Sequence, residues 1–380
     1  MVHTPAGIYL HVPFCRRKCD YCNFYSIPET HRIPELVAGI ETEIALRAEP
    51  GLPVDTVYFG GGTPSLLPPE SVERILGGLA GAFDILPGAE CSLEVNPGTV
   101  DAYNLAGFRG AGINRLTIGI QSFSDDVLRF LGRIHTGGQA LRTVAEARKT
   151  GFSNIGLDLI FGIPGQVEAA WRGDLEQAVA LSPEHLSCYQ LTYEEGTALD
   201  RARRAGRFEP LTDDAMARLF ETTREVLSEA GFHHYEVSNF ARSPELFSRH
   251  NMKYWTFAPY LGFGPSAHSY RHPDRFWNLP DIEGYLSALS EGRTPATGRE
   301  RLDRDQQMIE FLFLGMRMTT GIDIRQFEYR FGVRFTERFE PVLQALGEED
   351  WIRMEGGRCR PTFRGMAYAD GISRRLIDCL

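Results

Sequence analysis

From residue 7 to about residue 230, short apolar runs alternate with longer amphipathic segments. The apolar runs have the length of strands, whereas the segments between them are long and carry apolar residues at helical spacing. The predicted strands are Gly7–Val12, Thr56–Phe59, Cys91–Val95, Arg115–Ile120, Ile155–Ile160 and His185–Leu191. The predicted helices between them are Pro34–Ala48, Pro69–Leu79, Val100–Ala111, Gln139–Thr150 and Glu168–Leu181. This order predicts parallel strands joined by right-handed crossovers, in an open sheet or in a complete or partial barrel.

The rest of the chain has a different pattern. An amphipathic helix is predicted over Asp213–Ala230, with Thr212 or Asp213 as its cap. A charged run leads into an apolar-periodic helix over Met308–Met318, and a hairpin over residues 351–363 precedes a closing helix. We therefore predict an α/β protein with three parts. They are a core over residues 1–235, a connecting region over 236–298 and a small α+β domain of winged-helix type over 299–380.

Composition and charge narrow the classes of function. The 380 residues are 43% hydrophobic and 24% charged, as in an ordinary globular protein. A net charge of -10 disfavours a broad phosphate-binding surface, so we expect no nucleic acid partner. No apolar run has transmembrane length and no secretory signal pattern is present, so we expect a cytoplasmic protein. A reducing compartment suits unpaired thiols.

Three cysteines directly after the first predicted strand are the strongest chemical signal. Cys15, Cys19 and Cys22 lie within eight residues of each other. Thiolates at this spacing favour a soft metal centre, and an iron–sulfur cluster is the leading candidate. Three thiolates would leave one iron of a 4Fe-4S cluster open for a further ligand. A structural zinc site completed by His11, or a disulfide between Cys19 and Cys22, is the alternative.

Polar residues also mark the ends of the later predicted strands, where parallel barrels place their chemistry. The second strand ends in Gly60-Gly61-Gly62-Thr63, which either lets backbone groups approach a ligand or forms a simple turn. The third carries a carboxylate that is either a ligand contact or half of an ion pair. These further strand-end residues are Glu94 on the third strand, Gln121 and Arg133 after the fourth, and Asp158 on the fifth.

A second informative stretch is rich in aromatic residues. It runs through Tyr235–Phe240, Arg249–Trp255 and Tyr260–Tyr270. Aromatic side chains beside His250 could bind a flat apolar macrocycle, with imidazole as an axial iron ligand. The alternative is an aromatic-rich loop that packs on the barrel with His250 held by hydrogen bonds.

The motif Cys15-x3-Cys19-x2-Cys22, preceded by Tyr9-x-His-x-Pro-Phe, resembles the signature of the radical S-adenosylmethionine (SAM) superfamily. Within it, the sequence is similar to the branch that contains anaerobic coproporphyrinogen III oxidases and HemW haem chaperones. The resemblance implies a partial (β/α)6 barrel and a 4Fe-4S cluster on the three cysteines, with SAM on the fourth iron. The SAM contacts that it implies are Tyr9, Tyr21, Gly61, Gly62, Thr63, Glu94, Gln121, Arg133 and Asp158.

Three features distinguish the members of this branch. The residues His250, Asn251, Tyr254 and Trp255 match the HNxxYW motif associated with haem binding in HemW proteins. Coproporphyrinogen oxidases carry another cysteine two positions after the third, where this chain has Phe24, and a longer extension before the first cysteine.

The resemblance therefore implies a haem chaperone with a 4Fe-4S cluster, SAM and haem as cofactors. It would deliver haem to an apo-haemoprotein of the respiratory chain, which could be membrane-bound, and could itself form a homodimer. The alternative is a radical SAM decarboxylase that acts on coproporphyrinogen III. The cysteine signature is common to both, whereas the HNxxYW motif favours the chaperone.

Overall fold

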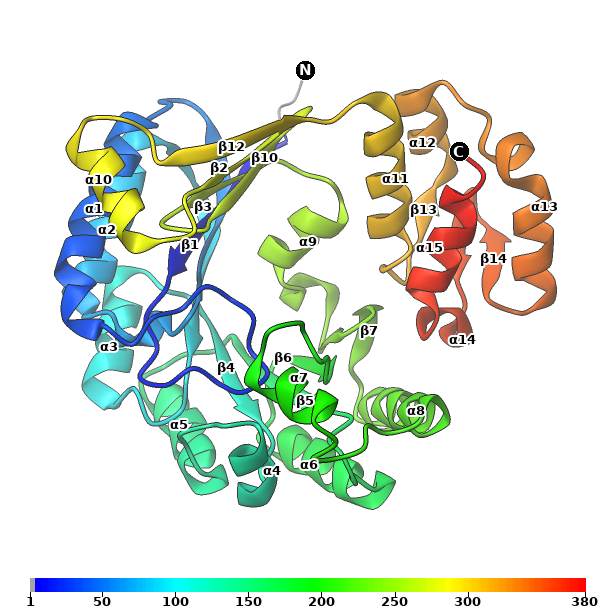
Figure 1. Ribbon diagram of the computed structural model, residues 1–380, viewed down its shortest axis with the longest axis horizontal. Coiled ribbons are helices and arrows are strands. Elements are labelled where there is room, and N and C mark those ends of the chain that lie inside the picture. Colours follow the sequence, from blue (N-terminus) through cyan, green and yellow to red (C-terminus); the bar gives the residue numbers. More distant parts are fainter. Residues whose placement is uncertain (1–3) are drawn as a thin grey trace.

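The computed structural model describes residues 4–380 of the chain. It contains a curved twelve-stranded sheet with helices along its outer side and a separate three-stranded sheet in the C-terminal part (Figure 1). The strand order of the large sheet is β12-β11-β10-β9-β1-β2-β3-β4-β5-β6-β8-β7. Strands β1 to β6 pair in parallel, each with the next. This is the partial (β/α)6 barrel that the resemblance to the radical SAM superfamily implied, whereas the sequence pattern alone had left an open sheet possible.

The parallel strands and their crossover helices follow the predicted order. The strands are β1 (Ala6–Val12), β2 (Pro53–Gly61), β3 (Asp84–Val95), β4 (Arg115–Gln121), β5 (Ile155–Phe161) and β6 (His185–Gln190). The helices are η1 (Thr30–Arg32), α1 (Ile33–Leu46), η2 (Pro64–Leu66), α2 (Pro69–Ala82), α3 (Ala102–Ala111), α4 (Asp125–Phe130), α5 (Gly137–Lys149) and α6 (Glu168–Ala180). The short α4 was not predicted, because its six residues span less than two helical turns.

The two faces of the parallel sheet differ in polarity. Side chains alternate between the faces of a strand, and the outward ones, such as Leu10, Ile118 and Leu157, are buried in the main hydrophobic core beneath the helices. The inward ones are mostly polar and include Tyr9, Glu94 and Asp158, which are half-buried. The barrel therefore has a polar interior that solvent reaches in part.

Residues beyond β6 extend the sheet at both edges. Strands β7 (His233–Glu236) and β8 (Asn239–Ala241) lie antiparallel beyond β6. Strand β9 (Tyr260–Phe263) pairs in parallel with β1, and β10 (His268–Arg271), β11 (Asp274–Asn278) and β12 (Ala296–Arg301) follow in antiparallel order. The region predicted to be a connection thus supplies strands. They are three to six residues long, and their aromatic residues fit a loop equally well by pattern.

Five further helices surround these strands. They are α7 (Ala198–Arg204), α8 (Asp213–Glu229), η3 (Pro244–Leu246), α9 (Arg249–Trp255) and α10 (Ile282–Ser290). The Thr212 side chain accepts a hydrogen bond from the backbone N–H of Ala215 and so caps α8. Of the two predicted caps, Thr212 and Asp213, the structure has Thr212. Ser248 caps α9 in the same way, which fixes the start of the helix that carries the HNxxYW residues.

The C-terminal part has a hydrophobic core of its own. It contains α11 (Arg304–Gly315), β13 (Ile322–Asp323), α12 (Ile324–Phe331), α13 (Phe335–Glu348), β14 (Ile352–Glu355), β15 (Arg358–Pro361), α14 (Phe363–Met366) and α15 (Ala369–Ile377). Strands β14 and β15 form the predicted hairpin, and β13 adds a third antiparallel strand. This α+β unit is placed beside the open side of the barrel, close to α9 and β7 (Figure 1).

Candidate functional site

The cysteine loop follows β1 and is fixed by backbone hydrogen bonds to three other segments. The N–H of Cys15 donates to the carbonyl of Ile27. The N–H of Asp20 donates to the Leu131 carbonyl, and the carbonyl of Asp20 accepts from Leu199 at the start of α7. The loop is therefore held across the carboxyl end of the barrel. Its half-buried cysteines, all free thiols, are Cys15, Cys19 and Cys22.

Two hydrogen-bond donors approach the sulfur atoms. Thr63 Oγ1 lies 3.4 Å from Cys15 Sγ, and Arg133 Nη1 lies 3.5 Å from Cys19 Sγ. Such donors stabilise thiolates, the form that binds iron. Burial raises the pKa of the Cys15 thiol, and Cys19 raises it further. The thiols are the donor type that an iron–sulfur cluster takes, and they would lose their protons on binding it.

Both ring nitrogens of His11 form hydrogen bonds within the chain. Its Nε2 donates to the carbonyl of Tyr25 at 2.9 Å, and its Nδ1 lies 3.1 Å from the hydroxyl of Tyr9. Burial lowers the pKa of His11 to about 4. With both ring nitrogens occupied, His11 has no free lone pair for a metal. These contacts disfavour a zinc site with His11 as fourth ligand, and Cys19 and Cys22 are free thiols in this structure.

The glycine run after β2 is required by close packing. A Cβ on Gly62 would lie 2.8 Å from the Phe14 carbonyl oxygen, and Gly61 adopts φ +110 against the His11 ring. The N–H of Gly62 donates to the carbonyl of Val12 at 2.8 Å. These glycines therefore let the loop lie directly against the base of the cysteine loop, with Thr63 beside Cys15.

Two carboxylates face each other across the barrel interior. Tyr58 donates to Glu94 Oε1 at 2.8 Å, and burial, with a smaller contribution from Asp158, raises the pKa of Glu94 to about 7. Burial likewise raises the pKa of Asp158 to about 6, and its Oδ1 is buried with no hydrogen-bond partner among residues 4–380. A cationic group of a ligand would relieve both costs, so this pair suits a positively charged ligand.

Arg133 joins the carboxyl ends of two strands to the cysteine loop. Its Nη2 donates to the Gly119 carbonyl at 2.7 Å and to Asn96 Oδ1 at 3.0 Å, and its Nη1 lies 3.5 Å from the Tyr21 hydroxyl. Gln121 is adjacent, in the left-handed conformation with φ 67. Sequence reasoning did not include Asn96, although its place at the end of β3 follows the same strand-end rule.

The structure places His250 inside the barrel floor. It is 1% exposed, and its Nδ1 and Nε2 form hydrogen bonds of 2.9 Å with Thr56 Oγ1 and the Tyr254 hydroxyl. Burial lowers the pKa of His250 to about 3, so the ring is neutral. The ring stacks on Tyr58 and Tyr9, with centroids 5.1 and 6.4 Å away. Of the two sequence-based alternatives, His250 fits the packed, hydrogen-bonded one.

The other HNxxYW residues connect this floor to the C-terminal part. The Arg317 guanidinium lies 4.7 Å from the centre of the Trp255 ring. Asn251 is half-buried on the first turn of α9, and its N–H donates to Ser248 Oγ. The motif therefore spans from the residues under the predicted SAM site to the boundary with the C-terminal part.

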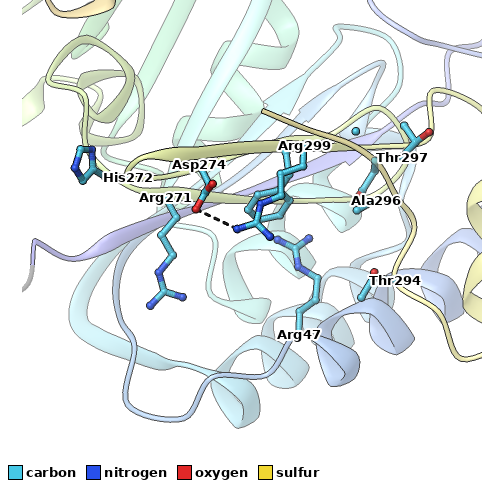
Figure 2. Close-up of a pocket in the computed structure, with 11 residues that line it drawn as sticks. Arg47, Arg271, His272, Asp274, Thr294, Ala296, Thr297 and Arg299 are labelled. Atoms are coloured by element: carbon cyan, nitrogen blue, oxygen red, sulfur yellow. Dashed lines mark ion pairs between the residues drawn. The ribbon is translucent and has the colours of Figure 1, made fainter. Parts of the chain in front are cut away.

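Outside the polar interior, two cavities adjoin the added strands. One of about 600 Å³ is enclosed by β10–β12 and the end of α1, and its arginines are engaged in ion pairs, such as Arg299 with Asp274 at 3.1 Å (Figure 2). Arg271 likewise pairs with Glu49. The second, of about 270 Å³, adjoins Tyr254 and lies between α9, β9–β11 and α11. None of the sequence-predicted residues lines the first cavity, and Tyr254 lines the second.

Within residues 4–380, no helix is both long enough and apolar enough to cross a bilayer.

Models of known protein families match two parts of the chain. The radical SAM superfamily model matches residues 9–178, and the HemN C-terminal domain model matches residues 302–368. Among solved structures, coproporphyrinogen III oxidase (HemN) of Escherichia coli superposes with a TM-score of 0.86 at 22% identity, over 100% of this chain and 91% of that one. At this identity the likeness concerns the fold.

Similarity to known sequences extends over nearly the whole chain. The protein named heme chaperone HemW of Mycobacterium tuberculosis is 37% identical and covers 99% of this chain and 96% of its own length. The one of Synechocystis is also 37% identical, over 93% and 87%. The mouse mitochondrial protein named radical S-adenosyl methionine domain-containing protein 1 is 41% identical, over 99% and 88%.

Proposed function

This chain belongs to the HemW family within the radical SAM superfamily, and from this premise we propose that it is a haem chaperone. It would bind a 4Fe-4S cluster, SAM and haem, and deliver haem to an apo-haemoprotein of the respiratory chain, in the cytoplasm or at a membrane-bound acceptor. One observation carries the proposal. The stack of Tyr9 on His250 connects the predicted SAM site to the HNxxYW helix within one packed interior.

The cluster would be held by Cys15, Cys19 and Cys22, would leave one iron open for SAM, and would supply one-electron reduction. Arg133 would then fix the cysteine loop, since it contacts Cys19 and Tyr21. Glu94 and Asp158 would face the positive groups of SAM, which would favour their ionised forms. The residues Gly61, Gly62, Thr63 and Gln121 complete the proposed SAM site.

The haem site is proposed at the HNxxYW helix. Because both nitrogens of His250 are occupied, we assign it the role of orienting Tyr254 rather than of binding iron. The other members of the motif are half-buried, so part of each side chain is accessible. They are Asn251, Tyr254 and Trp255. The net charge of -10 supports a partner other than nucleic acid, and a homodimer is a further proposal.

The test uses anaerobically reconstituted full-length protein. Stoichiometric haem is added and its Soret band is followed, and transfer to apo-myoglobin and to an apo-respiratory subunit is measured. In parallel, coproporphyrinogen III is incubated with SAM and a reductant. Stable haem binding and transfer without decarboxylated product would support the chaperone. Decarboxylated product would contradict it and favour the oxidase alternative.

A further inference from the structure

We infer that one edge of the haem enters the second cavity, beside Tyr254, and that Arg275 binds a haem propionate there. The inference rests on the proposed chaperone function and specifies where its cargo binds. The cavity has a volume of about 270 Å³ and is formed jointly by α9, the added strands β9–β11 and α11 of the C-terminal part. We call it the interdomain cavity.

The walls of the interdomain cavity are aromatic. Tyr254 and Tyr260 meet edge to face with centroids 4.8 Å apart, and Phe257 and Tyr270 lie 4.6 Å apart. Phe313 of α11 forms the opposite wall and is 38% exposed, although large apolar side chains are usually covered. Flat aromatic walls with one apolar residue open to solvent suit the edge of a planar, apolar ligand.

The size of the cavity limits what can enter. Pockets that enclose a whole drug-sized ligand measure roughly 300–1,000 Å³, so a cavity of about 270 Å³ admits part of a macrocycle. The remainder of the porphyrin would lie at the mouth, next to Phe313. A chaperone that must release its cargo requires such partial enclosure, because a fully enclosed haem dissociates slowly.

One charged pair closes the cavity. Arg275 Nη2 lies 2.6 Å from both carboxylate oxygens of Glu310, and the two side chains are 29% and 22% exposed. A guanidinium group binds carboxylates of any origin, so a propionate could replace Glu310. Arg275 belongs to β11 and Glu310 to α11, so this exchange would remove an ion pair between the barrel and the C-terminal part. Loading would therefore loosen their contact.

The Tyr254 ring gives the interdomain cavity a direct connection to the barrel floor. Its hydroxyl bonds to Nε2 of the buried His250, while its ring lines the cavity. His250 thus fixes the orientation of one wall without contacting the ligand. This arrangement accounts for a histidine and a tyrosine at this spacing on one helix.

The first test fills each cavity separately. Ala258→Phe fills the interdomain cavity, and Ala296→Phe is the matched control in the 600 Å³ cavity. Haem affinity is titrated by the Soret band, with cluster absorbance and circular dichroism as checks of folding. We expect Ala258→Phe to weaken haem binding about tenfold or more, since overpacking excludes the ligand, and Ala296→Phe to have no effect.

A second pair of variants tests whether a propionate replaces Glu310 on Arg275. For one of the two variants the expected result is a gain in haem affinity. Glu310→Gln frees Arg275 and should strengthen haem binding about two- to fivefold, the range expected for a partly exposed ion pair. Arg275→Met should weaken it. A gain of affinity does not arise from misfolding, so the first variant remains informative even if Ala258→Phe is unstable.

The outcomes separate the two proposals. If the wild-type protein binds no haem, the chaperone function itself fails. If the wild type binds haem but Ala258→Phe and Glu310→Gln leave its affinity unchanged, the inference is wrong while the function stands. Weakening by Ala296→Phe alone would also overturn it, and would place haem in the other cavity.

Discussion

The barrel interior and the core of the C-terminal part differ in the polarity of their side chains. The barrel interior holds charged or titratable groups such as Glu94, Asp158 and His250, and Oδ1 of Asp158 has no hydrogen-bond partner among the described residues. The C-terminal core is apolar and includes phenylalanines that contact one another edge to face or at a tilt. In the described residues after 300, the buried polar side chains are Thr362 and Ser373.

The difference shows what each region contributes. Buried apolar side chains stabilise a domain, by roughly 1.5–3 kcal/mol for each large one. Buried ionisable groups oppose folding unless they are paired, and the pKa shifts inside the barrel record this cost: burial raises that of Glu94 and lowers that of His250. The barrel interior therefore contains groups that lower stability, as a ligand site would require, whereas the C-terminal core contributes mainly stability.

The largest effect is expected on bound iron, when one cysteine from each region is replaced in turn. Cys19→Ala should abolish the bound iron and the visible absorbance of the reconstituted cluster, because a cubane with two protein thiolates is poorly held. Cys359→Ala, at a buried thiol in the C-terminal core, should keep both. Iron and acid-labile sulfide are measured after anaerobic reconstitution. Full iron content in the Cys19 variant would refute the cluster assignment.

The second prediction concerns the phenylalanine core. Phe327 is fully buried, and its ring lies 5.0 Å from that of Phe331 and 5.1 Å from that of Phe335. Phe327→Ala should destabilise the C-terminal part by about 3–5 kcal/mol through the cavity it leaves, while the cluster is retained. Calorimetric or denaturant unfolding would show this. Tyr329→Ala, on the same helix at 94% exposure, is the control and should leave the unfolding transition unchanged.

The smallest effect is a pH dependence inside the barrel. The pKa of Glu94 is raised to about 7. Between its unfolded value of about 4.3 and 7, the folded protein therefore binds more protons, and stability falls as pH rises through that window. Glu94→Gln should remove this fall and raise the stability of the ligand-free protein at pH 8 by about 1 kcal/mol, discounted for partial solvent access.

The pH dependence is tested with a control variant and with SAM as ligand. Melting temperatures of the wild type and the variant are measured from pH 5 to 8, and Glu73→Gln, on the exposed face of α2, should follow the wild type. SAM should stabilise the wild type more than Glu94→Gln, because the ionised carboxylate faces the positive ligand. Equal SAM-induced shifts would remove Glu94 from the proposed site.

The order of strands and helices was predictable from the chain, because the alternation of apolar runs and amphipathic segments specifies local structure and crossovers require parallel pairing. The cysteine spacing likewise predicted the proposed cluster loop, since all three residues lie in one short segment. The polar strand ends were predictable for the same reason: parallel strands bring their carboxyl ends to one edge.

The tertiary structure alone decided what depends on distant partners. It buried His250 between Thr56 and Tyr254, and these hydrogen bonds are the basis for proposing that His250 positions Tyr254 instead of binding iron. It also paired Arg275 with Glu310 across two parts of the chain and added short strands at both sheet edges. Sequence pattern reports the period of local structure, whereas the partner of a buried polar group can lie far along the chain, as Thr56 does from His250, 194 residues away. For that reason the sequence was sufficient to propose the chemistry of the cysteine loop, whereas the hydrogen bonds of the HNxxYW helix required the structure.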